Sequence, residues 1–220
     1  MIFEQRCAGC GKQGPILCRS CRFGLARPAG RPHRGDVIAA LPYVGRARRV
    51  VMALKYANRR QIAHHLAGLV VNAVVASGIQ PVDLDVVTWA PTSRRRIARR
   101  GVDQAELVAR RVAAQLGVPC RRLLRRDGPD RPQTGLSRAH RLHGPVFSAH
   151  PGVSGKRVLV IDDVVTTGST LSAAAAALMS AGALTVEKAV VAATPSAIIP
   201  GSSWPNRSGV ALAPVSAQAA

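Results

Sequence analysis

The sequence predicts an α/β fold, a doubly wound and mostly parallel sheet with a small zinc module at its N-terminus. Short apolar runs rich in β-branched residues, such as Val158 to Ile161, are typical of strands buried on both faces of a parallel sheet. Segments with apolar residues at helical spacing alternate with these runs, which is the pattern of strands joined by crossover helices. Two Cys-x-x-Cys pairs precede them all. We expect four parts, a zinc knuckle (1–27), a linker (28–36), the α/β domain (37–194) and a low-complexity tail (195–220).

Length and hydropathy are those of one main domain with small additions. The chain has 220 residues, of which 47% are hydrophobic, enough for a proper core. The longest apolar runs are shorter than a membrane span, and the first residues lack the apolar stretch of a signal peptide. We therefore expect a cytoplasmic protein.

The chain is strongly basic. Its 31 Lys and Arg residues against 11 Asp and Glu give a formal net charge of +20. Such a surface favours polyanions, including pyrophosphate-bearing sugars, nucleic acid and anionic membranes. A coding bias explains the charge equally well, because Ala, Arg, Gly and Pro are all abundant, so charge alone does not decide the partner.

The first of the expected parts holds the two cysteine pairs, Cys7 with Cys10 and Cys18 with Cys21, separated by seven residues. Four thiolates can close a tetrahedral Zn²⁺ site, and a small segment with few apolar residues needs such a staple. The zinc would be structural, because no ligand position stays open. Disulfides are the alternative, but nothing in the sequence indicates export. Cys120 stands alone, and we expect a core or half-buried thiol there.

Strands and helices are expected in alternation after the Gly- and Pro-rich linker. The expected strands are 37–44, 86–90, 118–124, 158–161 and 186–193. The expected helices follow Gly45 to near Tyr56, include Ile62 to Ala73, run from Ala105 to Leu116, and begin near Leu171. Pro42 confines the first strand to an edge or a bulge, because proline has no N–H for a strand partner.

A strand, two acids, a hydroxyl-rich turn and the start of a helix follow one another from residue 158 onward. Asp162 and Asp163 come at the expected carboxyl end of the strand, and their carboxylates can accept hydrogen bonds from a ribose diol. Backbone N–H groups and hydroxyls at the helix start can surround a phosphate dianion. The candidate phosphate-binding residues are Val165, Thr166, Thr167, Gly168, Ser169 and Thr170. The alternative is an ordinary buried strand whose acids cap the next helix.

Two acids followed by Thr-Thr-Gly resemble the signature of the type I phosphoribosyltransferases. The resemblance implies 5-phosphoribosyl 1-pyrophosphate (PRPP) with Mg²⁺ as the ligand, and the fold of that family. Thr166 stands where several purine-specific members carry an acid that assists the base, which argues against a classical purine salvage activity.

A second polar loop follows the strand expected at 86–90. Its candidate pyrophosphate-binding residues are Pro91, Thr92, Ser93 and Arg94. Backbone N–H groups and a guanidinium suit a pyrophosphate group. We expect Arg94 to offset charge on the leaving group, and we class it with Asp162 and Asp163 as the catalytic residues.

Further motifs resemble the ComF/GntX family over roughly residues 5 to 194. They are Leu-Pro-Tyr near Pro42, Leu54-Lys55-Tyr56, the run from Arg100 to Ala105, Gln133 with Leu136-Ser137, Gly144 to Phe147, and the four-cysteine knuckle. The resemblance adds Arg100 and Gln104 to the expected ligand contacts. Val102 and His143 depart from the family pattern, where an aromatic residue and Asn are usual.

The long polar segment 125–143 is expected to be the hood that closes over the ligand, with Gln133, Arg138 and Arg141 as candidates to reach it.

Three functions remain open from the sequence. The first is an enzyme that transfers phosphoribosyl to an unidentified acceptor. The second is a ComF-type protein that handles single-stranded DNA during natural transformation, a role that the resemblance implies. An aromatic content of only 3% leaves few platforms on which bases could stack. The third is a non-catalytic sensor of PRPP. A homodimer is a further expectation, because many relatives of this fold pair.

Overall fold

A five-stranded sheet forms the centre of the molecule and confirms the predicted fold class. The computed structural model describes residues 5–26, 33–34, 36–56, 59–127 and 145–195. The strand order is β1-β2-β7-β6-β3, and every pairing is parallel except that of β1 with β2. The strands are β1 (His33–Arg34), β2 (Val37–Pro42), β3 (Val86–Trp89), β6 (Arg157–Val165) and β7 (Thr185–Ala193).

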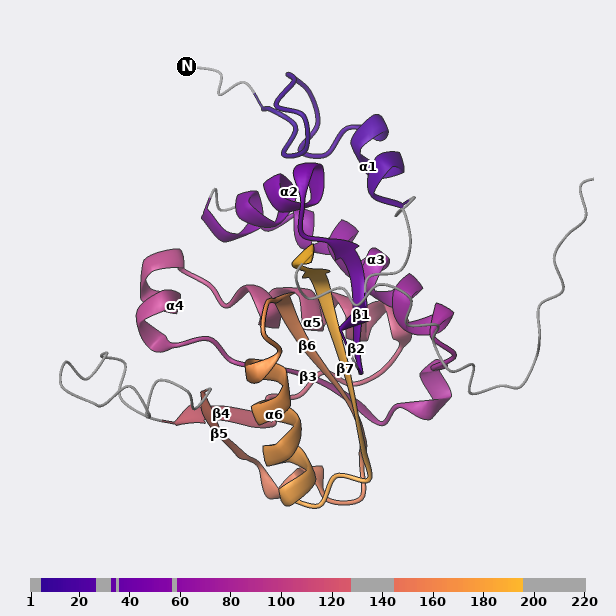
Figure 1. Ribbon diagram of the computed structural model, residues 1–220, viewed down its shortest axis with the longest axis vertical. Helices are drawn as coiled ribbons and strands as arrows, with labels where there is room; N and C mark the ends of the chain where they lie inside the picture. The colour runs from indigo at the N-terminus through magenta and orange to yellow at the C-terminus, as the bar shows by residue number, and fades with distance from the viewer. Residues whose placement is uncertain (1–4, 27–32, 35, 57–58, 128–144, 196–220) are drawn as a thin grey trace, which may run out of the picture.

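Helices cover both faces of this sheet (Figure 1). The helices on one face are α2 (Gly45–Tyr56), α3 (Ile62–Ala76) and α5 (Gln104–Leu116), and α6 (Ser169–Ser180) covers the other. Strand β6 shows why helices must cover both faces of the sheet. Its Leu159 and Ile161 belong to the core under α2, α3 and α5, and its Val158 and Val160 belong to the core under α6. All four side chains are 0% exposed, so the period-two alternation buries apolar residues on both faces.

Strand β6 is longer than predicted. It continues through Asp162 and Asp163 to Val165, so the acids lie at the carboxyl end of the strand as predicted but are part of it, and the predicted end at Ile161 is wrong. The neighbouring strand β7 is also nine residues long, and the pairing continues from Asp162 opposite Val190 to Val165 opposite Ala193. The ladder of hydrogen bonds outweighs the low strand propensity of aspartate.

The strand predicted from residue 37 ends at Pro42, two residues earlier than expected. The strand lies second in the sheet, but β1 pairs only with Val37 and Ile38. Pro42 thus pairs with Ala193 of β7 on one side and lies beyond the reach of β1 on the other, which explains how a proline is accommodated there.

A small antiparallel pair of strands lies beside α6, and it corrects the strand predicted at 118–124. The regular strands are β4 (Leu124–Asp127) and β5 (Val146–Ala149). The preceding segment makes only an isolated bridge, between Cys120 and Val87 of β3. Pro119 lies at that bridge and cannot donate a hydrogen bond, which keeps the pairing short.

A helix that the sequence analysis missed, α4 (Arg94–Arg100), begins directly after the polar loop. It contains five arginines and, as a fully described helix, has no buried residue. It therefore carries no apolar periodicity from which a helix could be predicted. Gly101, with φ of 73°, ends the helix in the left-handed conformation that glycine adopts most easily.

The N-terminal segment packs on the rest of the protein more closely than expected. It includes α1 (Arg19–Ala26), and its Leu17, Cys21 and Leu25 are buried in the same core as Val50 of α2. Arg49 Nε of α2 donates a hydrogen bond of 2.7 Å to the Gly9 carbonyl oxygen. The expected knuckle thus shares the main core, as its place above α2 in Figure 1 illustrates.

Several predictions fall on residues outside the described ranges. These are the linker residues 28–32 and 35, the hood at 128–144 with Gln133, Arg138, Arg141 and His143, and the tail from 196 onward. Within the described residues, every helix is too short or too polar to cross a membrane.

An ion pair connects the beginnings of β3 and β6. Asp85 accepts hydrogen bonds from Arg157 at Nη2 (2.9 Å), Nε (3.1 Å) and the backbone N–H (2.8 Å). The Arg157 side chain holds the pKa of Asp85 at about 2, well below its usual range. A carboxylate with a lowered pKa contributes stability above its unfolded-state pKa and loses it as the pH falls.

We expect Asp85→Asn to lower the free energy of unfolding at neutral pH, with the deficit vanishing as the pH falls from about 4 to about 2. Urea denaturation across this range measures the effect. A deficit that stays constant down to pH 2 would show that the carboxylate charge is not responsible.

Candidate functional site

The four N-terminal cysteines form one cluster. The sulfur atoms of Cys7, Cys10, Cys18 and Cys21 all lie within 4.8 Å of one another, and those of Cys10 and Cys18 are 3.9 Å apart. A tetrahedral Zn²⁺ site with Zn–S bonds of about 2.3 Å requires sulfurs about 3.8 Å apart. All four cysteines are free thiols. The cluster therefore fits a metal ion such as zinc, as predicted.

Backbone groups around the cluster favour thiolates. The N–H groups of Gly9 and Cys18 point at Cys7 Sγ, at 3.4 and 3.3 Å. Burial raises the pKa of Cys7, but these donors outweigh it and bring the pKa to about 6. Burial and the neighbouring sulfurs raise the pKa of Cys21 to about 12, because a second negative charge in the cluster is unfavourable without a cation. A bound cation would remove this penalty.

A second site lies at the carboxyl end of β6, where Asp163 pairs with a lysine. Lys55 Nζ of α2 is 2.9 Å from Asp163 Oδ2, and the two side chains are only 14% and 15% exposed. The neighbouring Asp162 accepts a hydrogen bond of 2.7 Å from the Asp163 backbone N–H through Oδ1. The predicted acidic pair therefore exists, but one of its members already has a cationic partner.

Asp162 is in an unfavourable place for a negative charge. Burial, followed by the Asp163 carboxylate, raises the pKa of Asp162 to about 8. The Asp163 backbone N–H and Lys55 act in the opposite direction without cancelling the effect. A divalent cation or a donor-rich ligand beside this carboxylate would favour its ionised form.

The loop between β6 and α6 presents the predicted hydroxyl groups. Gly168, with φ of 86°, occupies the N-cap position of α6 and offers no side chain to the helix start. Thr167 Oγ1 and Ser169 Oγ are 3.0 Å apart, and Thr166, Thr167 and Ser169 are exposed. Because the first N–H groups of a helix lack partners in the preceding turn, this loop can receive an anion. Val165, the last strand residue, is buried.

The loop after β3 is held by an aspartate that the sequence analysis did not single out. Asp103 Oδ2 accepts from the Thr92 N–H (2.9 Å), and its Oδ1 accepts from the Ala105 N–H (3.1 Å). Asp103 is thus the N-cap of α5 and fixes the segment Pro91–Ser93. Burial raises its pKa in spite of these donors. A polar residue directly before a helix is a recognisable cap signal, so its role could have been predicted.

The predicted Arg100 and Gln104 are in contact, in a hydrogen-bonded series that includes Tyr56. Arg100 donates to Gln104 Oε1 (3.0 Å) and to the Tyr56 hydroxyl (2.9 Å). Gln104 is 1% exposed and donates to the Val102 carbonyl oxygen (3.1 Å). Arg94 lies at the first turn of α4, and its side chain is exposed.

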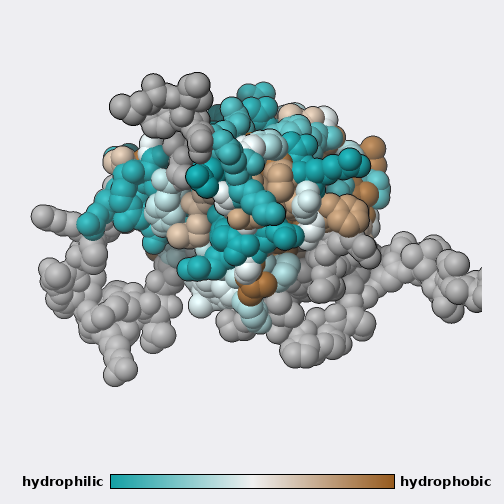
Figure 2. Space-filling view, turned by 90° about the horizontal axis from the view of Figure 1, so that it is seen from above, coloured by the Kyte–Doolittle hydropathy of each residue, from teal (hydrophilic) through white to brown (hydrophobic). Residues whose placement is uncertain are grey.

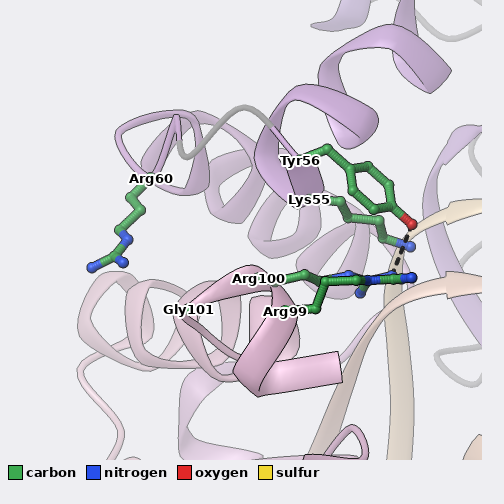
Figure 3. Close-up of a pocket in the computed structure, with 6 residues that line it drawn as sticks. All are labelled: Lys55, Tyr56, Arg60, Arg99, Arg100 and Gly101. Carbon is green, nitrogen blue, oxygen red and sulfur yellow. Dashed lines mark hydrogen bonds between the residues drawn. The ribbon is translucent and has the colours of Figure 1, made fainter. Parts of the chain in front are cut away.

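A cleft of about 290 Å³ opens beside these residues (Figure 3). Its lining residues, which we name the cationic cleft, are Lys55, Tyr56, Arg60, Arg99, Arg100 and Gly101. Seen from above, most of the described surface of the protein is hydrophilic, with separate apolar patches (Figure 2). Lys55 and Tyr56 belong to one of the motifs that resemble the ComF/GntX family, but they lie far from the acids in sequence, so their place in this site was not predicted.

The acidic pair and the loop that follows it fall within a match to a known family. A family model described as the phosphoribosyl transferase domain matches residues 97–209. The chain belongs to the phosphoribosyltransferase family. Its predicted likeness to the ComF/GntX family is also confirmed, by relatives that match over most of the chain.

Those relatives are named DNA utilization protein YhgH. The protein from Salmonella typhimurium is 30% identical over 196 residues, which cover 82% of this chain and 86% of that protein. The adenine phosphoribosyltransferase of Nocardia farcinica is 41% identical over 97 residues, covering 41% of this chain and 50% of that protein. Among solved structures, a glutamine PRPP amidotransferase from B. subtilis matches with 26% identity and a TM-score of 0.42, over 64% of this chain and 30% of that one.

The cysteine cluster predicts a metal content. We expect the purified protein to carry about one zinc ion per chain, and Cys21→Ser to lose most of it and to melt at a lower temperature. Elemental analysis and thermal denaturation measure both. Cys120→Ser is the control, because Cys120 lies outside the cluster. Equal zinc content in both variants would rule out the site.

The raised pKa of Asp162 predicts a pH dependence of stability. In wild type, the unfolded state ionises above about pH 4 while the folded state stays protonated to about pH 8, so stability falls across this interval. Asp162→Asn keeps an oxygen for the Asp163 N–H and removes the titration. We expect the variant to gain stability relative to wild type as the pH rises, by at most about 1.4 kcal/mol per pH unit. Urea denaturation at a series of pH values measures the free energy of unfolding of both proteins. A difference between them that does not change with pH would contradict this prediction.

Proposed function

We propose that this protein binds PRPP with Mg²⁺ and transfers its phosphoribosyl group to an acceptor. The observation that carries the proposal is the arrangement at one edge of the sheet. Asp162, Asp163 and the loop of residues 165–170 lie at the carboxyl end of β6, and the loop of residues 91–93 follows the adjacent parallel strand β3. Ligands of open α/β sheets bind at the carboxyl ends of the strands.

The proposed sugar-phosphate contacts follow from the chemistry of each segment. Asp162 and Asp163 hold the ribose diol, directly or through Mg²⁺. The 5′-phosphate sits at the start of α6, where N–H groups and the Thr167 and Ser169 hydroxyls converge. This proposal assigns the phosphate to Val165, Thr166, Thr167, Gly168, Ser169 and Thr170.

The proposed pyrophosphate contacts are Pro91, Thr92, Ser93 and Arg94, with Arg100 and Gln104 behind them. Asp103 keeps the Thr92 segment in place by accepting a hydrogen bond from the Thr92 N–H while it caps α5 through the Ala105 N–H. Mg²⁺, when bound, would be held near Asp162 and Asp163 and would offset charge on the leaving group. The protein holds these groups in line, and that positioning is its main contribution to the rate.

The transfer itself needs no covalent enzyme residue. The C1–O bond to pyrophosphate breaks, and its electron pair leaves with pyrophosphate. The acceptor's nucleophile bonds to C1 through an oxocarbenium-like transition state and releases its proton to water. Asp163 is paired with Lys55 at 2.9 Å, and in this proposal it would exchange that partner for the ribose diol.

A second function, handling of single-stranded DNA, is favoured by two observations. The matching relatives are named DNA utilization proteins, and helix α4 of this chain presents five arginines. Arginine contacts to phosphates would give binding that weakens steeply with salt. The two functions are compatible, because one protein can bind both PRPP and a nucleic acid.

Calorimetric titration of the zinc-loaded protein with PRPP and Mg²⁺ tests the first proposal. We expect binding in the micromolar range, about −8 kcal/mol, and loss of at least about tenfold in affinity in Asp162→Ala/Asp163→Ala, because the diol or cation then lacks its acceptors.

The matched control is Glu106→Ala/Asp127→Ala. It also removes two carboxylates, whose partners are Arg110 and Arg125 outside the site, and should bind PRPP as wild type does. Equal binding by wild type and the Asp162/Asp163 variant would reject the assignment. Binding without turnover against a panel of acceptors would favour a sensor.

A further inference from the structure

The cationic cleft is a site of unusual composition. Four of its six lining residues are cations, and the other two are Tyr56 and Gly101. Carboxylate and amide side chains are missing from this lining. Lys and Arg side chains have only hydrogen-bond donors, and the Tyr56 hydroxyl is engaged by Arg100. The lining therefore suits an anion, and it lacks the mixture of donors and acceptors that would read the edge of a free nucleobase.

One of these cations is already fixed in position. Arg100 is held by Gln104 Oε1 at 3.0 Å and by the Tyr56 hydroxyl at 2.9 Å, and its guanidinium lies 4.9 Å from the centre of the Tyr56 ring. Its Nε is buried and has no hydrogen-bond partner among the described residues. Arg100 is therefore not a freely moving surface charge, and a ligand that it binds has less ordering entropy to overcome.

Two of the four lining cations lack an acidic partner among the described residues. Neither Arg99 nor Arg100 forms an ion pair with a carboxylate in the part of the chain that the structure describes. Arg60 Nη2 lies close to Gly101, 3.6 Å from the place where a Cβ would be. Lys55 contacts a carboxylate, that of Asp163.

The shared lysine places the cleft beside the acidic pair. Lys55 lines the cleft and also contacts Asp163. The cleft is bounded by the end of α4, whereas the proposed pyrophosphate loop precedes the start of that helix. Seven helical residues span about 10 Å, so the cleft is separate along the chain from both loops to which the proposed function assigns PRPP phosphates. Arg100 belongs both to this lining and to the proposed pyrophosphate contacts, so the test of the cleft relies on Arg60 and Arg99, which belong to the cleft alone.

We propose that the cationic cleft binds a phosphate group of the acceptor, so that the acceptor is a nucleotide and not a free base. That the bound nucleotide is the acceptor rests on the proposed function. That the cleft binds an anion does not. A volume of about 290 Å³ is at the lower end for small-molecule sites, about 300–1,000 Å³. It suits a phosphate and part of its sugar, with the rest of the acceptor extending toward Asp163.

Titration of adenosine 5′-monophosphate (AMP), with adenosine as the phosphate-free comparison, tests the site. Both are titrated into the full chain with and without saturating PRPP and Mg²⁺. We expect AMP to bind at least about tenfold more tightly than adenosine, and PRPP to leave this binding intact. A short oligothymidylate in parallel shows whether the phosphate source is a mononucleotide or a nucleic acid.

Two double variants distinguish binding in the cleft from non-specific attraction by the positive charge of the protein. Arg60→Ala/Arg99→Ala removes two lining residues, and Arg95→Ala/Arg96→Ala removes two exposed arginines of the same helix region outside the lining. We expect at least about a tenfold loss of AMP affinity in the first and less than about threefold in the second, with PRPP affinity unchanged in both. Thermal melts confirm that both variants fold.

The outcomes are distinguishable. Competition between AMP and PRPP, equal binding of adenosine, equal losses in the two variants, or no binding of either AMP or the oligothymidylate would each overturn the cleft assignment. Failure of PRPP to bind would remove the proposed function. AMP binding that is lost only in Arg60→Ala/Arg99→Ala would still establish the anion site.

Discussion

A half-buried ion pair between Lys55 of α2 and Asp163 of β6 joins the N-terminal part of the chain to the functional edge of the sheet. A carboxylate at this depth needs a partner, because an uncompensated buried charge costs several kcal/mol, on the order of 3–5. Asp162 next to it forms no ion pair among the described residues, and burial raises the pKa of its carboxyl. The site is thus already arranged for a cation or a donor-rich ligand to complete it.

Helix α2 connects this pair to the cysteine cluster. One of its turns contacts the cluster through Arg49 and the Gly9 carbonyl, and its final residues supply Lys55 and Tyr56. Gly9 is required there, since a Cβ would lie 2.7 Å from Cys21 Sγ. The knuckle, the shared core and the acidic pair are therefore parts of one packed unit, and a metal in the knuckle would stabilise the helix that reaches the site.

The parts of this fold that bury apolar residues could be predicted from sequence. Strands β3, β6 and β7 and helices α2, α3 and α5 each have the required periodicity. Helix α4 could not be predicted in this way, because its arginines are not buried, and the extension of β6 through the acids depends on pairing with β7.

The candidate site was likewise predicted only in part. The cysteines, the acids and the two polar loops are local patterns. Lys55 contacts Asp163, and Tyr56 contacts Arg100, only because the chain folds. Residue spacing in the sequence does not encode these contacts.

The most direct measurement is hydrogen–deuterium exchange of the backbone amides with and without PRPP and Mg²⁺. If the start of α6 binds the 5′-phosphate, the amides of residues 166–170 should exchange more slowly in the complex, together with those of residues 92–94, because their N–H groups then donate to phosphate oxygens. Unchanged exchange at 166–170 under saturating ligand would contradict the assignment of this loop as the phosphate site.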